Sequence, residues 1–259
     1  IRDLANLDFN TFDPNTDVEI LTDLDGPPNK INWPNGAPKA PDGMLPFQAL
    51  VVSQGFHVAE PPGRLSIINL DEPGYPEYIV HQSTGTDAGG CVLGSEDNDP
   101  RFYHETLFID MDADGLKDIV TARSTFKVTG AGSFCFFVGE LVYFKNPGAA
   151  LDPNTEWEEH VLFGLPYNPV GPDLSLDAHD FENDGVPEIV AAKFFGAGAG
   201  IRIFGAPSGQ LWSAIDPGVG INPRIGIVIG SDVAGLPFHV KIVDINNDGF
   251  EDMIVPNGW

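Results

Sequence analysis

Basic residues are scarce in this chain, and their scarcity narrows the choice of partners. The 259 residues include 13 Lys and Arg against 38 Asp and Glu, which gives a formal net charge of -25. A surface this acidic repels phosphate backbones and anionic lipid headgroups. No apolar run approaches the roughly 18 residues of a membrane-spanning helix. We therefore expect neither nucleic acid as a partner nor insertion into a membrane.

Cysteine is nearly absent as well. The two cysteines, Cys91 and Cys135, lie in segments rich in Gly, Ser and Thr that have the composition of loops. In an extracellular protein they would form one disulfide that joins two long loops, and two unrelated free thiols are the alternative. The sequence shows no signal peptide and begins with Ile1 instead of Met. We interpret it as the mature form or an excised fragment of a secreted protein.

Common catalytic motifs are also missing. The chain contains no Gly-x-Ser-x-Gly elbow and no His-Glu-x-x-His pair. The glycine-rich run 195–200 joins two predicted strands and does not precede a helix, which disfavours a phosphate-binding loop. The sequence motifs therefore identify no enzyme class.

An acidic loop of nine residues occurs three times, at 110–118 (the first loop), 180–188 (the second loop) and 244–252 (the third loop). Each copy has an oxygen-bearing side chain at positions 1, 3, 5 and 9 and a glycine at position 6. Calcium takes six to eight oxygen ligands, and alternate residues of a tight loop can direct their oxygens to one centre. We therefore predict about three structural Ca²⁺ sites. The predicted ligands, which include the backbone carbonyl of position 7, are Asp110, Asp112, Asp114, Leu116 and Asp118; Asp180, Glu182, Asp184, Val186 and Glu188; and Asp244, Asn246, Asp248, Phe250 and Asp252.

These loops are not EF-hands. An EF-hand needs a bidentate Glu at position 12 and a helix on each side. Position 12 is occupied by Thr121, Ala191 and Val255. The flanking segments 106–109 and 240–243 are short, β-branched or aromatic, as strands are. The pattern therefore predicts strand, metal loop and strand.

The segments between the loops predict four-stranded units. Glycine and proline are abundant, with 30 and 23 residues, which is typical of short strands joined by turns. The strands predicted upstream of the loops are 17–22 and 48–53; those of the first unit are 105–109, 118–122, 140–144 and 156–163; those of the second are 174–178, 189–194, 200–204 and 210–215; a third unit begins at Phe238. Trp157 and Trp212 recur at the start of the fourth strands and are predicted to lie in the core between units. Repeated units of this length are typical of a β-propeller.

We therefore predict an all-β fold, a β-propeller whose four-stranded blades carry calcium loops between their first two strands. Residues 1–259 are interpreted as one propeller domain or a propeller fragment, with a degenerate region at 1–64 and recognisable repeats at 65–259. A weaker copy of the loop at 69–77 has Pro73 in place of the third ligand. We expect this copy to keep the fold and to bind metal poorly.

The loop pattern resembles the FG-GAP/VCBS repeat family. Residues 110–120, 180–190 and 244–255 carry the resemblance well, and 69–80 carries it imperfectly. The resemblance implies a propeller, usually of seven blades, with structural calcium between the first two strands of a blade. Leu141–Gly148 and Trp157–His160 are also similar to the propeller of fungal aldos-2-ulose dehydratase. Family members include integrin α-subunit heads, fungal lectins and parts of polysaccharide-processing enzymes, so membership implies architecture more than function.

The leading functional expectation is recognition of an extracellular glycan or protein without catalysis. The predicted insertions 83–100 and 124–138 are the candidate binding loops. Aromatic side chains in loop-like contexts are candidates for stacking on sugar rings, namely Trp33, Tyr75, Tyr103, Tyr167 and Trp259. A purely structural role in a larger extracellular assembly is a further alternative.

The enzymatic alternative is a carbohydrate lyase or dehydratase. His104, Asp173 and His239 precede the three loops by six, seven and five residues. In a propeller these positions begin the innermost strands, so the three side chains would converge in the central channel as acid and base. Whether the protein is an enzyme is left open by the sequence.

Overall fold

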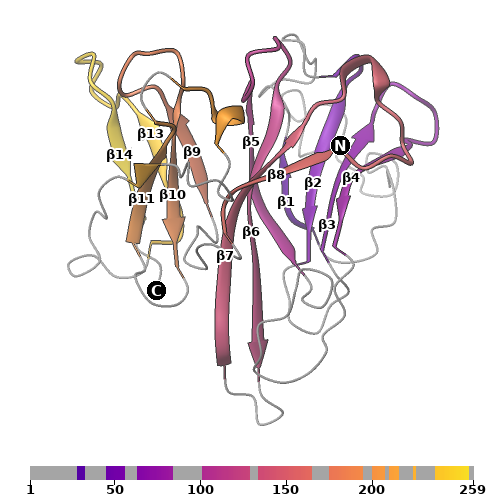
Figure 1. The fold of residues 1–259 in the computed structure, drawn as a ribbon, viewed down its shortest axis with the longest axis horizontal. Helices are drawn as coiled ribbons and strands as arrows, with labels where there is room; N and C mark the ends of the chain where they lie inside the picture. Colours follow the sequence, from indigo (N-terminus) through magenta and orange to yellow (C-terminus); the bar gives the residue numbers. More distant parts are fainter. Residues whose placement is uncertain are drawn as a thin grey trace, which may run out of the picture.

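The computed structural model describes residues 28–32, 45–55, 63–83, 101–128, 134–164, 175–194, 200–207, 210–215, 224–225 and 237–256. These residues form an all-β structure, as predicted, with several antiparallel sheets (Figure 1). Two short 3₁₀ helices, η2 (Gly148–Ala150) and η3 (Trp212–Ala214), accompany the strands. Within these ranges, no helix has the length and apolar character needed to cross a membrane.

Three sheets have four strands each and a fourth sheet has two, and in each of them the strands are neighbours in chain order. The first sheet contains β1 (Pro28–Asn32), β2 (Ala49–Gln54), β3 (Arg64–Asn69) and β4 (Glu77–Gln82). The second contains β5 (Phe102–Ile109), β6 (Asp118–Val128), β7 (Phe134–Lys145) and β8 (Glu158–Phe163). The third contains β9 (Leu176–His179), β10 (Glu188–Lys193), β11 (Gly200–Gly205) and β12 (Arg224–Ile225), and the fourth β13 (Lys241–Val243) and β14 (Asp252–Ile254).

Successive sheets pack face to face, and their first strands lie side by side. β5 contacts β1 and β2 on one side and β9 on the other, and β9 contacts β13. Separate apolar clusters fill the spaces between neighbouring sheets: Phe144 and Trp157 belong to the first cluster, Met111 and Trp212 to the second, and Ile242 to the third. Both tryptophans are buried, which confirms their predicted place in the core. In the part of the chain that the structure describes, these sheets do not close into a ring.

A buried ion network joins the second sheet to the first. Arg123 on β6 donates to Glu140 at 2.8 Å and, through both terminal nitrogens, to Glu159 at 2.7 Å. Glu159 also lies 3.1 Å from Nε2 of His81 on β4. Although burial opposes its ionisation, the Arg123 charge holds the pKa of Glu159 below its usual range. The buried charges are thus tolerated because each has an opposite partner.

The predicted strand at 210–215 is wrong. Residues 212–214 form η3, and the fourth strand of this sheet is β12 at 224–225. The indole of Trp212 donates to the carbonyl of Pro187 at 2.9 Å, and the Ser213 N–H donates to the carbonyl of Met111 at 3.1 Å. The first bond ties the turn to the second loop of its own sheet and the second ties it to the first loop of the preceding sheet, so tertiary contacts override a strand-like pattern of only six residues.

The interpretation of 124–138 as a loop is also wrong for most of its length. β6 continues to Val128 and β7 begins at Phe134, and the two pair from Ser124 with Gly139 to Val128 with Phe134. The resulting hairpin extends past the neighbouring strands (Figure 1). Aromatic and β-branched residues are frequent in 125–128 and 134–138, and in paired strands their preference for extended backbone outweighs the flanking Gly and Ser.

Other predictions lie outside the described residues. They are the strand 17–22, most of the insertion 83–100, Asp173, and the aromatics Trp33, Tyr167 and Trp259. The disulfide prediction is untested for the same reason, since Cys91 lies outside and Cys135 is placed only as part of β7. Tyr103, predicted as a loop aromatic, lies instead in β5, fully buried, with its hydroxyl 2.5 Å from Nδ1 of His81.

Candidate metal centre

The three acidic loops occupy equivalent places in their sheets. The first loop connects β5 to β6, the second β9 to β10, and the third β13 to β14. In each case the loop joins the first strand of a sheet to the second strand, as the sequence predicted.

The three loops also share one backbone conformation. The residue at position 4 has a positive φ in every copy, 61° at Ala113, 54° at Asn183 and 58° at Asn247. The glycine at position 6 follows with φ values of 89°, 87° and 88°. These values lie in the left-handed region, where an L side chain is disfavoured and glycine is not. The same unusual conformation has therefore formed three times from the same pattern.

The position 1 carboxylate organises each loop from within. Asp110 accepts the N–H groups of positions 5 and 6 at 3.1 and 2.9 Å. Asp180 and Asp244 accept the equivalent pairs, each at 3.1 and 2.8 Å. These bonds close the turn and leave further lone pairs on the carboxylate oxygens.

The position 9 carboxylate anchors the far end of each loop. It accepts the N–H of position 2, with distances of 2.9 Å at Asp118, 2.9 Å at Glu188 and 3.1 Å at Asp252. Positions 1 and 9 are thereby brought to the same side of the loop. This arrangement repeats although position 9 is Asp in two copies and Glu in the other.

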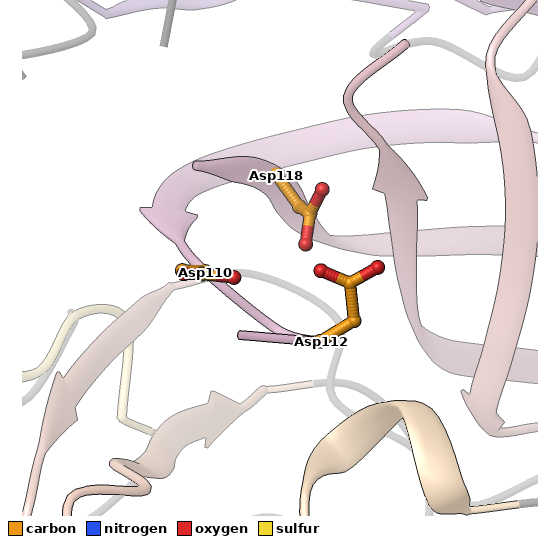
Figure 2. Close-up of side chains that lie close together, drawn as sticks. All are labelled: Asp110, Asp112 and Asp118. Carbon is orange, nitrogen blue, oxygen red and sulfur yellow. The ribbon is translucent and has the colours of Figure 1, made fainter. Parts of the chain in front are cut away.

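Carboxylate oxygens gather most closely in the first loop. Asp110, Asp112 and Asp118 each have an oxygen within 4.8 Å of the others, a group suited to hold a metal ion. Figure 2 shows the carboxylates of Asp112 and Asp118 facing each other, with Asp110 beside them. Burial, helped by the nearby charges of Asp112 and Asp114, raises the pKa of Asp118 to about 6, although the hydrogen bonds from the Asn146 and Met111 N–H groups oppose the shift. The site therefore concentrates negative charge at the edge of the core.

A cation of the protein itself already contacts this group. The ammonium of Lys145, at the end of β7, binds the carboxylate of Asp112 and lies 3.2 Å from Oδ2 of Asp114. Its hydrogen bond to Asp112 is the main reason that the pKa of Lys145 lies above its usual value. The donor set is thus all-oxygen, anionic and arranged to receive positive charge, which is the chemistry that Ca²⁺ selects.

The weaker copy at 69–77 does not adopt this loop. It connects β3 to β4, the third and fourth strands of its sheet, so it is not equivalent in position. Its positive φ values fall on the adjacent residues Gly74 and Tyr75, at 87° and 49°. Glu72, at position 4, precedes Pro73, and a proline pushes the preceding residue away from helical backbone angles toward extended ones. The expectation that this copy keeps the loop fold is therefore wrong.

His104 and His239, two members of the predicted catalytic trio, differ in burial. His104 is buried on β5 with its ring against Phe102, 5.1 Å between centroids. Burial lowers the pKa of His104 to about 3, so its ring is neutral at physiological pH. His239 lies just before β13 and is 41% exposed. The third member, Asp173, lies outside the described residues, so the convergence of the three side chains stays a prediction.

His239 contacts two residues that the sequence analysis missed. The Ser175 hydroxyl lies 2.7 Å from Oε2 of Glu105 and hydrogen-bonds with Nδ1 of His239, which is 3.5 Å from the same carboxylate oxygen. Glu105, Ser175 and His239 each stand five residues before the first Asp of their loop. A constant offset from the loops would have found them, whereas the predicted trio used three different offsets.

Comparison with known proteins adds no relative. No family model matches the chain, and no curated protein or solved structure matches it significantly. The resemblance to the FG-GAP/VCBS repeats therefore rests on the loop residues themselves and stays a prediction.

Proposed function

We propose that this protein is a calcium-stabilised module of the β-propeller type that recognises an extracellular glycan or protein. The calcium part is carried by one observation, the nine-residue loop that recurs three times with the same hydrogen bonds. A single Asp-Gly turn would carry little weight. Three copies at equivalent sheet positions are difficult to explain as solvated turns.

The loops fit calcium through their oxygen side chains. Positions 1, 3, 5 and 9 would hold the ion, together with the carbonyl of position 7. Bound calcium would supply positive charge that offsets the repulsion between these carboxylates, so its binding would add to the folding free energy. The chain's own residues prepare the site, because positions 1 and 9 are already fixed by backbone N–H groups.

The propeller arrangement is supported by how equivalent residues meet. Glu105, Ser175 and His239 share one offset from their loops and contact one another across three sheets. Asp177 and Lys241, which share another offset, form an ion pair at 2.9 Å. Such contacts require neighbouring first strands in matching register, which is how blades sit around a propeller axis.

The recognition part rests on loops held by a rigid frame. Calcium would fix the connections between first and second strands and so lower the ordering cost of binding. The β6–β7 hairpin projects beyond its neighbours (Figure 1) and is the described element best placed to contact a partner. The acidity of the chain favours neutral or cationic ligand surfaces over anionic ones.

Calcium titration tests the first part. The full chain is titrated calorimetrically, and its thermal unfolding is followed in calcium and in chelator. We expect about three bound ions and a higher unfolding midpoint in calcium, with one ion lost in Asp248→Asn. Asp152→Asn is the matched control, because Asp152 is an exposed turn residue outside the loops and accepts the N–H of Asn154. No binding heat and equal midpoints would overturn the proposal.

Glycan screening tests the second part. The calcium-saturated chain is heated with a panel of neutral and cationic glycans, and a glycan-specific rise in midpoint is the expected result. The same rise should vanish in chelator, because the loops would no longer hold the frame. If no glycan of the panel shifts the unfolding midpoint, glycan recognition is excluded for these glycans and a protein surface remains as the proposed ligand.

One observation favours an enzymatic alternative. Ser175 donates its hydroxyl proton to Glu105, so its oxygen accepts from Nδ1–H of His239. With the proton on Nδ1, the lone pair of a neutral His239 ring is on Nε2. The structure gives this nitrogen no hydrogen-bond partner among the described residues. Such a histidine can act as a general base toward a carbohydrate in a lyase or dehydratase reaction.

Activity assays decide this alternative. Turnover of polysaccharides or ketoses that is lost in His239→Gln and kept in His179→Gln would support it. His179, half-buried beside the second loop, is the matched histidine. Equal turnover of both variants and the wild type would remove His239 from any catalytic role.

A further inference from the structure

A lysine side chain contacts the carboxylates of the first loop. Lys145, which lies 33 residues beyond Asp112 in the chain, reaches back from the end of β7 to bind Asp112 and Asp114. The Asp112 side chain is mostly buried, and Lys145 is about one-third exposed at 35%. The ammonium therefore lies between two predicted calcium ligands and is partly shielded from water.

The sheet register shows that the second loop has no equivalent of this lysine. Ile119 pairs with Phe144 in the second sheet, and Ile189 pairs with Phe204 in the third. Lys145 therefore corresponds to Gly205, which has no side chain to reach the second loop. Among the described residues, the sheet of the third loop contains only β13 and β14, so it offers no position for this comparison.

The end of β7 is fixed against the loop, which keeps the ammonium in reach. The Asn146 N–H donates to Oδ1 of Asp118 at 2.8 Å, and its side-chain amide donates to the Lys117 carbonyl at 3.0 Å. The Asn146 side-chain oxygen accepts the Gly148 N–H at 2.9 Å. A cation tethered so closely acts at a high effective concentration, because little chain entropy is lost when it binds.

We propose that Lys145 is a built-in counter-ion of the first loop, which calcium must displace from its ligands. The inference rests on the proposed calcium binding and adds an internal competitor at the first loop. The first loop stays neutralised and folded when calcium is removed, and it binds calcium more weakly than it would without this lysine.

Calorimetry on a single-loop background tests whether Lys145 competes with calcium. Asp184→Asn with Asp248→Asn leaves only the first loop intact, and Lys145→Gln is compared with Lys145→Arg on that background. We expect Lys145→Gln to tighten calcium binding about tenfold, since two partly exposed ion pairs no longer compete. Lys145→Arg keeps the charge and should change the affinity much less. Equal affinities with and without the Lys145→Gln substitution would overturn the inference.

A second measurement separates this inference from the function on which it rests. In chelator, Lys145→Gln should lower the unfolding midpoint, and Asp112→Asn in the same chain should restore part of the loss. If the wild type binds calcium while Lys145→Gln changes neither affinity nor midpoint, the inference fails and the proposed function stands. If the wild type binds no calcium at any loop, the proposed function fails and the inference with it.

Discussion

The first and third loops have the same backbone and different surroundings. At position 2, Met111 of the first loop is 1% exposed, whereas Ile245 of the third is 60% exposed. At position 7, Leu116 is partly covered by its neighbours and Phe250 is 77% exposed. The first loop is covered by η3 of the following sheet through the Ser213–Met111 hydrogen bond. No described element lies in the same place over the third loop.

This contrast separates the effect of the loop's own sequence from the effect of the segments that cover the loop. The positive φ values and internal hydrogen bonds agree between the loops, so the nine-residue pattern sets the conformation locally. Burial, the raised pKa of Asp118 and the contact with Lys145 occur where neighbouring segments cover the loop. Residues distant in sequence therefore set the burial and the charge environment of the first loop. The third loop shows the conformation that the nine-residue pattern forms without such cover.

Shortening the position 2 side chain should reveal the largest difference. Met111→Ala removes a fully buried side chain from the core between the second and third sheets and should cost about 3 kcal/mol of unfolding free energy. Ile245→Ala should change it by less than about 0.5 kcal/mol, because the side chain is mostly in water. Denaturant unfolding of both variants measures the two changes in unfolding free energy. Similar losses would mean that burial does not distinguish the loops.

Removing the position 9 carboxylate should give the next largest contrast. Asp118→Ala leaves the buried N–H groups of Met111 and Asn146 without an acceptor, at a cost of about 2 to 3 kcal/mol. Asp252→Ala exposes the Ile245 N–H to water and should cost under about 1 kcal/mol. Unfolding in chelator checks both without any metal contribution. Asp118→Asn, which keeps one acceptor oxygen, should recover part of the loss.

The loops and their flanking strands were predictable because their signals are local. A run such as Ile119-Val120-Thr121 favours a strand by residue type, and the spacing of Asp110, Asp112 and Gly115 defines the turn. The copy at 69–77 shows the limit of such patterns, because it has a different turn around Pro73 and connects the third and fourth strands of its sheet.

Two sets of contacts were not predictable in this way: those within the polar group of Glu105, Ser175 and His239, and those of Lys145 with the first loop. Glu105, Ser175 and His239 are far apart in sequence and meet because β5, β9 and β13 lie side by side. Lys145 reaches the first loop because β7 pairs with β6 in a register that places its end beside Asp118. Strand pairing between distant segments decides these contacts, and no single segment encodes it.

Acid sensitivity should differ between the histidines that precede the two loops. Buried His104 remains neutral down to about pH 3, whereas an unfolded histidine takes up a proton near pH 6.5. The unfolded state therefore binds more protons between these values, and stability falls with falling pH by up to about 1.4 kcal/mol per unit. His104→Gln should remove that part of the slope between pH 6 and 4.5. An unchanged slope in unfolding experiments would contradict the burial of a neutral ring.

The same experiment on His239 supplies the contrast. His239 precedes the third loop and is 41% exposed, so its replacement by Gln should change the unfolding free energy less than the replacement of His104. A larger effect of His239→Gln would mean that its contacts with Glu105 and Ser175 join the sheets more strongly than the buried position does.

The smallest effect concerns position 4, where the first loop has Ala113 and the third has Asn247. Both residues have a left-handed backbone, with φ of 61° and 58°. Asn tolerates this conformation better than Ala, because its side chain can hydrogen-bond to the local backbone. Ala113→Asn should therefore raise the unfolding free energy by about 0.5 to 1 kcal/mol, and Asn247→Ala should lower it by a similar amount.

Equal and opposite shifts in these two variants would show that the loop conformation contributes the same free energy whether or not the loop is covered. Denaturant unfolding in chelator measures them without calcium. A gain from Ala113→Asn much smaller than the loss from Asn247→Ala would mean that packing around Met111 and the Lys145 contact already hold the first loop in its strained backbone. The local pattern would then set the conformation fully only where no neighbouring segment supports it.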